Sequence, residues 1–261
     1  MIKKPILTLL SALLVSACAT SPTGRTQFTF MPDAQINQMG LQAFESLKKQ
    51  KPISQNSRYQ QFASCIAQAI LPLVGGQWEV VVFEDNSQNA FALPGNKIGV
   101  HTGLIDLVDN QDQLATVIGH EIGHVLAKHS NERMSQEFAV SQGMAAVQAI
   151  AAPQSALGQT AIGLLGAGAE LGIILPYSRL HESEADVIGL DLMAKAGFDP
   201  QQSILLWQKM SQAGGGQGPA EFLSTHPAHG TRIEELQKRM PQALQYRQQA
   251  IAMGKQPRCA K

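Results

Sequence analysis

The chain has 261 residues, with 20 lysines and arginines against 20 aspartates and glutamates, and 44% of the residues are hydrophobic. This length suffices for one domain with a sizeable core. The charge balance argues against nucleic-acid binding, which needs a basic footprint.

The N-terminus has the pattern of a secretory signal peptide over residues 1–17. Two lysines precede an apolar run at residues 6–17, which is too short to cross a bilayer as a helix. Val15-Ser16-Ala17-Cys18 resembles a bacterial lipobox, in which cleavage precedes a cysteine that then receives lipid; an ordinary signal peptide with a nearby cysteine is the alternative. We expect a periplasmic protein anchored through Cys18 without spanning the membrane. Ala19 resembles the signal for sorting to the outer membrane.

Cleavage at this point would leave 244 residues (261 − 17), with 18 basic residues (20 − 2) against 20 acidic ones. Two further cysteines, Cys65 and Cys259, would remain in an oxidising compartment. They can pair in a disulfide, or stay as two free thiols. The sequence does not give the distance that would decide between these alternatives.

Residues 18–32 are rich in Thr, Ser, Pro and Gly, and we predict a lipidated N-terminus and flexible tether there. A single domain is expected over residues 33–261. Apolar residues at helical spacing predict one helix from Asp33 to about Leu47 and another over residues 59–73. Both apolar stripes are assigned to core packing.

Three short strands are predicted next. Residues 78–83 have β-forming composition, and residues 89–93 and 97–101 flank a Pro-Gly-Asn turn as a hairpin. An edge strand there can pair with an extended peptide through backbone hydrogen bonds, although a purely structural hairpin is the alternative. His101, alone on its strand, is more typical of a structural residue than of a metal ligand.

Residues 114–127 are predicted to form an apolar helix that contains the motif His-Glu-x-x-His. His120 and His124 are one turn apart, so both imidazoles can hold one metal ion. Glu121 is then positioned as a general base toward water. The alternative is a chance match in which both histidines are satisfied core residues.

Two features after this motif are less informative. His129 lies about half a turn around the helix from His120 and one residue short of the metzincin spacing, so we exclude it as a ligand. Residues 139–175 are small and apolar, with Glu170 as their only charge. Glu170 and the glycines interrupt every apolar run before it is long enough to span a membrane. Two buried helices or a mobile cover over the site remain open as interpretations.

A second helix, predicted within residues 177–189, carries two carboxylates on one face. Glu182 and Asp186 are four residues apart, so one can bind a metal while the other orients an imidazole. Glu184 points about 200° away from Glu182. Small residues at Ala185 and Gly189 would permit close approach to the His120 helix. We select Glu182 as the ligand; an ordinary solvated helix face is the alternative.

Three motifs together resemble metallopeptidase family forty-eight. They are His-Glu-x-x-His, then Ser-Arg-x-x-Glu-x-x-Ala-Asp-x-x-Gly, then Ser-Thr-His-Pro before Arg-Ile. The resemblance runs from about Asn89 to Ile233. This is the gluzincin group of the CAAX prenyl, HtpX and Oma-type proteases and of periplasmic enzymes such as BepA and LoiP.

The resemblance implies one Zn²⁺ per chain and a role for each motif residue. His120, His124 and Glu182 would bind the metal, Glu121 would be the catalytic base, and Asp186 would support the first histidine. It further implies catalytic roles for His226, near the zinc, and Arg232, which borders the site. The implied substrate-binding edge comprises Asn89, Ala90, Phe91 and Ala92.

We therefore expect an α+β fold, a mostly helical domain with a small sheet beside the motif helix. The expected function is a zinc-dependent endopeptidase that cleaves misfolded or unassembled envelope proteins. The main rival is a periplasmic chaperone or assembly factor for outer-membrane proteins, with a structural or latent zinc site closed by His226. The oligomeric state is not predicted.

Overall fold

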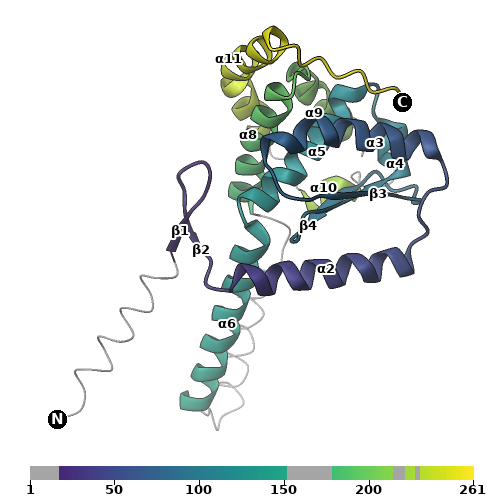
Figure 1. The fold of residues 1–261 in the computed structure, drawn as a ribbon. Coiled ribbons are helices and arrows are strands. Elements are labelled where there is room, and N and C mark those ends of the chain that lie inside the picture. Colours follow the sequence, from purple (N-terminus) through teal and green to yellow (C-terminus); the bar gives the residue numbers. More distant parts are fainter. Residues whose placement is uncertain (1–17, 152–177, 214–220, 227–229) are drawn as a thin grey trace.

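The structure is a computed structural model that describes residues 18–151, 178–213, 221–226 and 230–261. The predicted signal peptide and the part of the 139–175 segment beyond Ala151 lie outside the described residues. Helices predominate, and a three-stranded sheet borders the central helix (Figure 1). The expected α+β class is confirmed.

Helix α5 (Gln111–Leu126) is the buried centre of the molecule. It begins at Asn110, whose side-chain oxygen accepts the backbone N–H groups of Asp112 and Gln113, each at 3.0 Å. This cap satisfies two of the amide donors that a helix start leaves free.

Helix α8 (Arg179–Lys195) packs closely against α5. A Cβ atom added to Gly189 would lie 2.6 Å from the backbone nitrogen of His120, and one added to Gly123 would lie 2.8 Å from the carbonyl oxygen of Ala185. Small residues at these crossing points therefore allow the two backbones to approach. The prediction that Gly189 and Ala185 serve this purpose is confirmed.

The sheet has the order β3 (Glu79–Phe83), β5 (Lys97–His101), β4 (Ala90–Leu93). Strands β4 and β5 form an antiparallel hairpin in which Ala90 pairs with Val100, whereas β3 and β5 are parallel. The predicted hairpin is confirmed, and β4 is an edge strand of this sheet. Because α5 contacts β4, the edge lies beside the motif helix.

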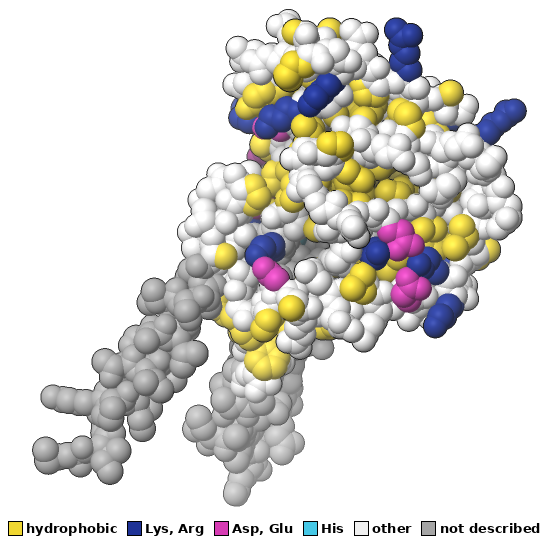
Figure 2. Space-filling model, viewed as in Figure 1, with side chains coloured by type: hydrophobic (Ala, Val, Ile, Leu, Met, Phe, Trp, Pro, Cys, Tyr) yellow, Lys and Arg dark blue, Asp and Glu magenta, His cyan; other side chains and the backbone are white. Residues whose placement is uncertain are grey.

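The remaining helices surround this centre. Helix α6 extends from the body, and α2 runs along the side of the sheet away from α3 (Figure 1). The face in Figure 2 exposes many apolar side chains and only small groups of charged ones. The other helical elements are α2 (Asp33–Gln50), α3 (Ser57–Ile70), η1 (Leu71–Leu73), α4 (Thr102–Leu107), α6 (His129–Ala151), α9 (Gln201–Ala213), α10 (Glu221–Thr225) and α11 (Gly230–Ala252).

The segment after Cys18 differs from the flexible tether that its composition predicts. It forms an antiparallel hairpin of β1 (Cys18–Thr20) and β2 (Thr26–Phe28), with Ala19 opposite Gln27. Polar side chains of this hairpin reach α6 and α8. Composition did not reveal these contacts because their partners lie more than a hundred residues away in the chain.

A disulfide joins Cys65 on α3 to Cys259 near the C-terminus, with the two Cα atoms 5.7 Å apart. Of the two alternatives left open for these cysteines, the structure contains the pair. No helix in the described part of the chain is long and apolar enough to cross a membrane.

Candidate metal centre

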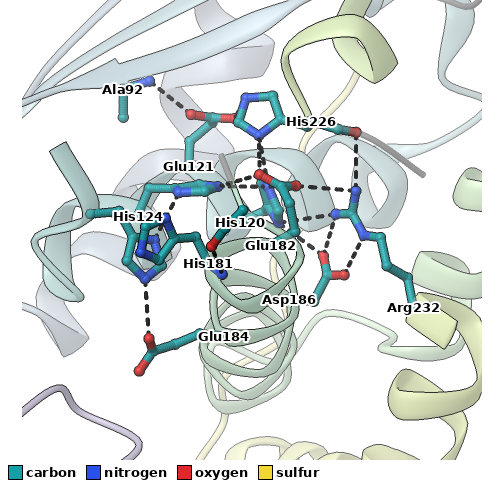
Figure 3. A network of polar contacts seen from close by, with 12 residues as sticks. Ala92, His120, Glu121, His124, His181, Glu182, Glu184, Asp186, His226 and Arg232 are labelled. Atoms are coloured by element: carbon teal, nitrogen blue, oxygen red, sulfur yellow. Dashed lines mark hydrogen bonds and ion pairs between the residues drawn. The ribbon is translucent and has the colours of Figure 1, made fainter. Parts of the chain in front are cut away.

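Four side chains from three segments converge at the contact between α5 and α8. They are His120, His124, Glu182 and His226, all buried, and one ligand atom from each lies within 4.8 Å of those of the others. Figure 3 shows His226 above the two α5 histidines and Glu182 beside them. His226 follows α10, and its ring stacks on that of Phe222 with centroids 4.4 Å apart.

Most of the distances among these atoms are close to those around a tetrahedral metal ion. Metal–ligand bonds of about 2.0–2.1 Å separate tetrahedral ligand atoms by about 3.3 Å. The His120 Nε2 atom lies 3.0 Å from His124 Nε2, 3.3 Å from His226 Nδ1 and 3.4 Å from Glu182 Oε2. Glu182 Oε1 lies 3.4 Å from His124 Nε2 and 3.0 Å from His226 Nδ1.

The chemistry of the four groups also fits zinc, which accepts imidazole nitrogens and a carboxylate oxygen. Glu182 Oε2 is buried and accepts no hydrogen bond from a described residue, although the guanidinium of Arg232 lies 3.2 Å away. The burial of this oxygen without a hydrogen bond leaves it available to a metal ion, while Arg232 offsets part of its charge. The residues present therefore fit a metal ion.

Glu121 lies between the cluster and the edge strand β4 (Figure 3). Its Oε2 atom accepts the backbone N–H of Ala92 at 2.8 Å, and its Oε1 atom lies 3.4 Å from His226 Nε2. The helix therefore places a carboxylate beside the cluster but outside it. This is the position that a general base toward water requires.

Asp186 lies directly behind His120. Its Oδ1 atom is 2.9 Å from His120 Nδ1, which leaves the Nε2 atom facing the cluster. Arg232 donates two hydrogen bonds to Asp186, from Nε to Oδ2 at 2.6 Å and from Nη2 to Oδ1 at 2.7 Å. Arg232 is itself buried, so it positions Asp186 and Glu182 and does not open toward a substrate.

A second and longer set of contacts lies behind His124. His129 Nδ1 is 2.9 Å from His124 Nδ1, and His129 Nε2 is 3.1 Å from Glu184 Oε2. His129 is not part of the cluster, but the expectation that it faces away from the site is wrong. Helix α5 ends at Leu126, and Lys128 has φ +52°, so His129 begins a new helix in another direction.

The charges of the side chains suit metal binding. Burial raises the pKa of Glu182, but contacts with His120, His124 and His226 outweigh it and hold this pKa far below its usual range. Burial lowers the pKa of His124, so its imidazole is neutral, as a ligand must be. Burial also raises the pKa of Glu121, which makes it a stronger proton acceptor.

The pKa of His120 shifts in the opposite direction to that of His124. Burial lowers it, but Asp186 and Glu182 outweigh this and raise the pKa to about 9, so a metal ion that binds His120 must displace a proton. Burial lowers the pKa of His129 to about 4, against the opposing effect of Glu184. The pKa of Asp186 is lowered because Arg232 outweighs the effect of burial.

The predicted substrate strand presents its two faces differently. Ala90 and Ala92 are buried in the main core together with residues of α5, whereas the ring of Phe91 packs on Phe44 and Phe83 in a separate cluster. Asn89 accepts the Ala90 N–H at 2.9 Å through its side chain. The backbone of β4, and not the Phe91 side chain, therefore faces Glu121.

Sequence reasoning missed the roles of His129 and Glu184. The i, i+4 rule finds partners on one helix face, and Glu184 points to the other face of α8. The signal that could have revealed these roles is the end of α5. The sequence becomes polar after Ala127-Lys128, which indicates that the apolar helix stops there. His101, judged structural, contacts Ser87 Oγ at 2.7 Å and is not in the cluster.

The sequence model described as "Peptidase family M48" matches residues 52–240. This interval includes the four cluster residues, Glu121, Asp186 and Arg232. The match covers well over half of the chain.

Several curated proteins are similar in sequence. "Mitochondrial metalloendopeptidase OMA1" of Schizosaccharomyces pombe is 40% identical over 168 residues, which is 64% of this chain and 48% of that protein. "Metalloprotease YcaL" of Escherichia coli is 31% identical over 188 residues, 72% of each chain. "Beta-barrel assembly-enhancing protease" of Yersinia pestis is 34% identical over 163 residues, 59% of this chain and 32% of that protein. The chain thus spans about half the length of the OMA1 relative.

Proposed function

This chain belongs to peptidase family M48, and on that premise we propose that it is a zinc-dependent endopeptidase. The observation that carries the proposal is the buried cluster whose ligand atoms lie at tetrahedral spacing beside Glu121. His120, His124 and Glu182 would hold the zinc. Zinc, when bound, supplies Lewis acidity that makes water more acidic and polarises a peptide carbonyl.

Glu121 performs the proton transfers in this proposal. It takes a proton from the attacking water and passes one to the leaving amine, so it begins and ends the reaction ionised. Burial favours this role because it strengthens the carboxylate as a proton acceptor. His226 Nε2, 3.4 Å from Glu121 Oε1, is positioned to donate to the oxyanion that forms on the substrate.

The edge of β4 is the proposed substrate-binding surface. Its Ala92 N–H, which now donates to Glu121, points toward the motif helix. An extended peptide pairing with Ala90 and Ala92 would bring a carbonyl next to Glu121. Recognition through the backbone favours extended, unfolded segments, because folded proteins usually protect their strand edges.

The proposed place of action is the bacterial envelope. The lysine-bearing signal pattern and the lipobox-like segment ending at Cys18 support a lipoprotein facing the periplasm, and Ala19 supports the outer membrane. The name of the Yersinia relative refers to β-barrel assembly. Misfolded or unassembled envelope proteins are accordingly the proposed substrates.

Glu121→Gln tests the proposal, because it removes the base and keeps the shape. Purified variant and wild type are compared for zinc content and for cleavage of casein and an unfolded porin. We expect equal zinc content and loss of cleavage. The matched control is Glu45→Gln, at an exposed glutamate of α2. Undiminished cleavage by Glu121→Gln would defeat the assignment.

A second candidate function rests on the position of His226. Its Nδ1 atom lies 3.0 Å from Glu182 Oε1, so His226 occupies the place of a fourth ligand. A site closed by four side chains is structural or latent. The protein would then be an assembly factor, or a protease held shut until His226 moves.

The variant His226→Ala separates these cases. Increased cleavage would identify a latent protease, and lost cleavage with unchanged zinc content would identify His226 as an oxyanion donor. A chaperone with structural zinc would show no cleavage in either protein, and the variant would bind zinc more weakly.

A further inference from the structure

The contacts behind His124 form a continuous path to the N-terminal hairpin. His124 Nε2 faces the ligand cluster, and its other ring nitrogen contacts His129, which in turn contacts Glu184. All three side chains are buried. Beyond His124, this path lies outside the residues that would bind zinc or react.

The chemistry of the ring nitrogens fixes the direction of each hydrogen bond. If His124 binds zinc through Nε2, its proton is on Nδ1, and that N–H donates to His129 Nδ1 at 2.9 Å. The proton of neutral His129 is then on Nε2, which donates to Glu184 at 3.1 Å. The path therefore ends at a carboxylate that must be held in place.

The hairpin holds that carboxylate. Arg25 Nε donates to Glu184 Oε2 at 2.8 Å, and the Thr23 hydroxyl donates to Glu184 Oε1. The Glu184 side chain is only 3% exposed and that of Arg25 17% exposed, so the contact is largely removed from water. Glu184 forms ion pairs with Arg25 and with no other lysine or arginine in the described part of the chain.

Arg25 also acts on the face of the His129 ring. Its two terminal nitrogens donate to Glu132 at 2.8 and 2.6 Å, and Glu132 accepts from His181 Nε2 at 3.0 Å. The His181 ring stacks on His129 with centroids 4.4 Å apart. One guanidinium thus fixes His129 both at its edge, through Glu184, and at its face, through His181.

We propose that Arg25 is a positioning residue for the metal ligand His124, acting through Glu184 and His129. The metal centre is therefore complete only when the hairpin of residues 18–28 is docked on α6 and α8. This inference rests on the proposed function in one respect, that His124 binds zinc. A purely structural anchor would hold the hairpin but leave the affinity of the centre for zinc unchanged.

The test compares Arg25→Met with Arg239→Met in the full chain, purified in detergent. Arg239 of α11 donates to both oxygens of Asp191, at 3.0 and 2.6 Å. It forms a matched arginine–carboxylate pair whose carboxylate is also on α8, without a link to a ligand. The readouts are zinc affinity, from competition with a chelating dye, and the visible absorption spectrum of the Co²⁺-loaded protein.

We expect Arg25→Met to weaken zinc binding about 10- to 100-fold, as loss of groups that orient ligands does. The Co²⁺ spectrum should change, and Arg25→Lys should restore part of the affinity. Arg239→Met should match the wild type in both readouts. Wild-type affinity and spectrum in Arg25→Met, with reduced thermal stability alone, would overturn the inference in favour of a structural anchor.

Two further outcomes are also decisive. A wild-type chain that binds no zinc would refute the proposed function itself, and the inference with it. Equally tight zinc binding by the wild type and Arg25→Met would refute the inference alone. If Arg25→Met does not fold, Thr23→Val removes one hydrogen bond from Glu184 at a smaller cost. Unchanged zinc affinity and Co²⁺ spectrum in that variant would then overturn the inference.

Discussion

The two histidines of α5 are supported in different ways, although each support ends at a carboxylate held by an arginine. His120 contacts Asp186 directly, and Arg232 fixes Asp186 with two hydrogen bonds. His124 is separated from its carboxylate by a second histidine. The direct support lies within the packed helices α5, α8 and α11, whereas the indirect one extends to the N-terminal hairpin.

This difference separates two ways of orienting a ligand. Burial and the packing of α5, α8 and α11 fix the direct support, because all of its members are buried. The indirect support adds a segment whose docking has its own equilibrium, since a short hairpin is marginally stable by itself. The orientation of His124 therefore depends on a contact that can be lost while the core stays folded.

Asp186→Asn should have the largest effect, because it removes the charged group that accepts two hydrogen bonds from the buried Arg232. Breaking a buried pair costs about 3–5 kcal/mol of the free energy of unfolding, and zinc affinity should fall about 10- to 100-fold. Urea unfolding of the metal-free protein and chelator competition measure the two effects. Glu184→Gln is the matched change on the indirect side, where Arg25 retains Glu132 and is partly exposed. Equal destabilisation by both changes would contradict the distinction.

Removal of the disulfide should lower stability without affecting either support. The double change Cys65→Ser and Cys259→Ser opens a link between residues 194 positions apart, and such links contribute about 2–4 kcal/mol to the free energy of unfolding. Thermal unfolding and zinc competition are the measurements. A weaker zinc affinity would mean that the C-terminus acts on the site.

Gly189→Ala should disturb the close packing of α5 against α8, on which the orientation of both histidines depends. The new Cβ would lie 2.6 Å from the backbone of His120, and overpacking of this kind costs about 1–3 kcal/mol. Denaturant unfolding gives the cost. Leu180→Ala, at a residue of α8 that is 55% exposed, is the control and should change little. A neutral Gly189→Ala would show that the helices can separate freely.

Asn110→Ala should have the smallest effect, about 1 kcal/mol, from loss of the N-cap of α5. Because α5 carries both His120 and His124, the contacts behind the two histidines should be affected equally. Zinc affinity should stay unchanged. Asn56→Ala removes the corresponding cap of α3 and should cost a similar amount. A selective loss of zinc binding in Asn110→Ala would contradict this expectation.

The sequence was sufficient for those parts of the site that depend on local periodicity. The 3.6-residue repeat alone places His120 and His124 on one face of α5, and Glu182 and Asp186 on one face of α8. The Pro-Gly-Asn turn between two short β-forming segments likewise predicted the β4–β5 hairpin. These relations connect residues a few positions apart, so they needed no knowledge of the tertiary fold.

Contacts between distant segments could not be predicted in this way. Arg25 and Glu184 are 159 residues apart, and composition alone made the Arg25 segment look like a tether. The angular rule misplaced His129 because it assumed that α5 continues past Lys128. For Cys65 and Cys259 the sequence supplied two reactive groups but not the distance between them.

The distance in sequence between Arg25 and Glu184 imposes an order on the maturation of the site. The hairpin is synthesised before α5, α6 and α8, yet its partner carboxylates on α6 and α8 come later, so it has nothing to dock on until most of the chain exists. The first described segment to leave the ribosome would thus be among the last to reach its final position. If Arg25 positions His124 as proposed, the centre would therefore be fully ordered only after most of the chain is available.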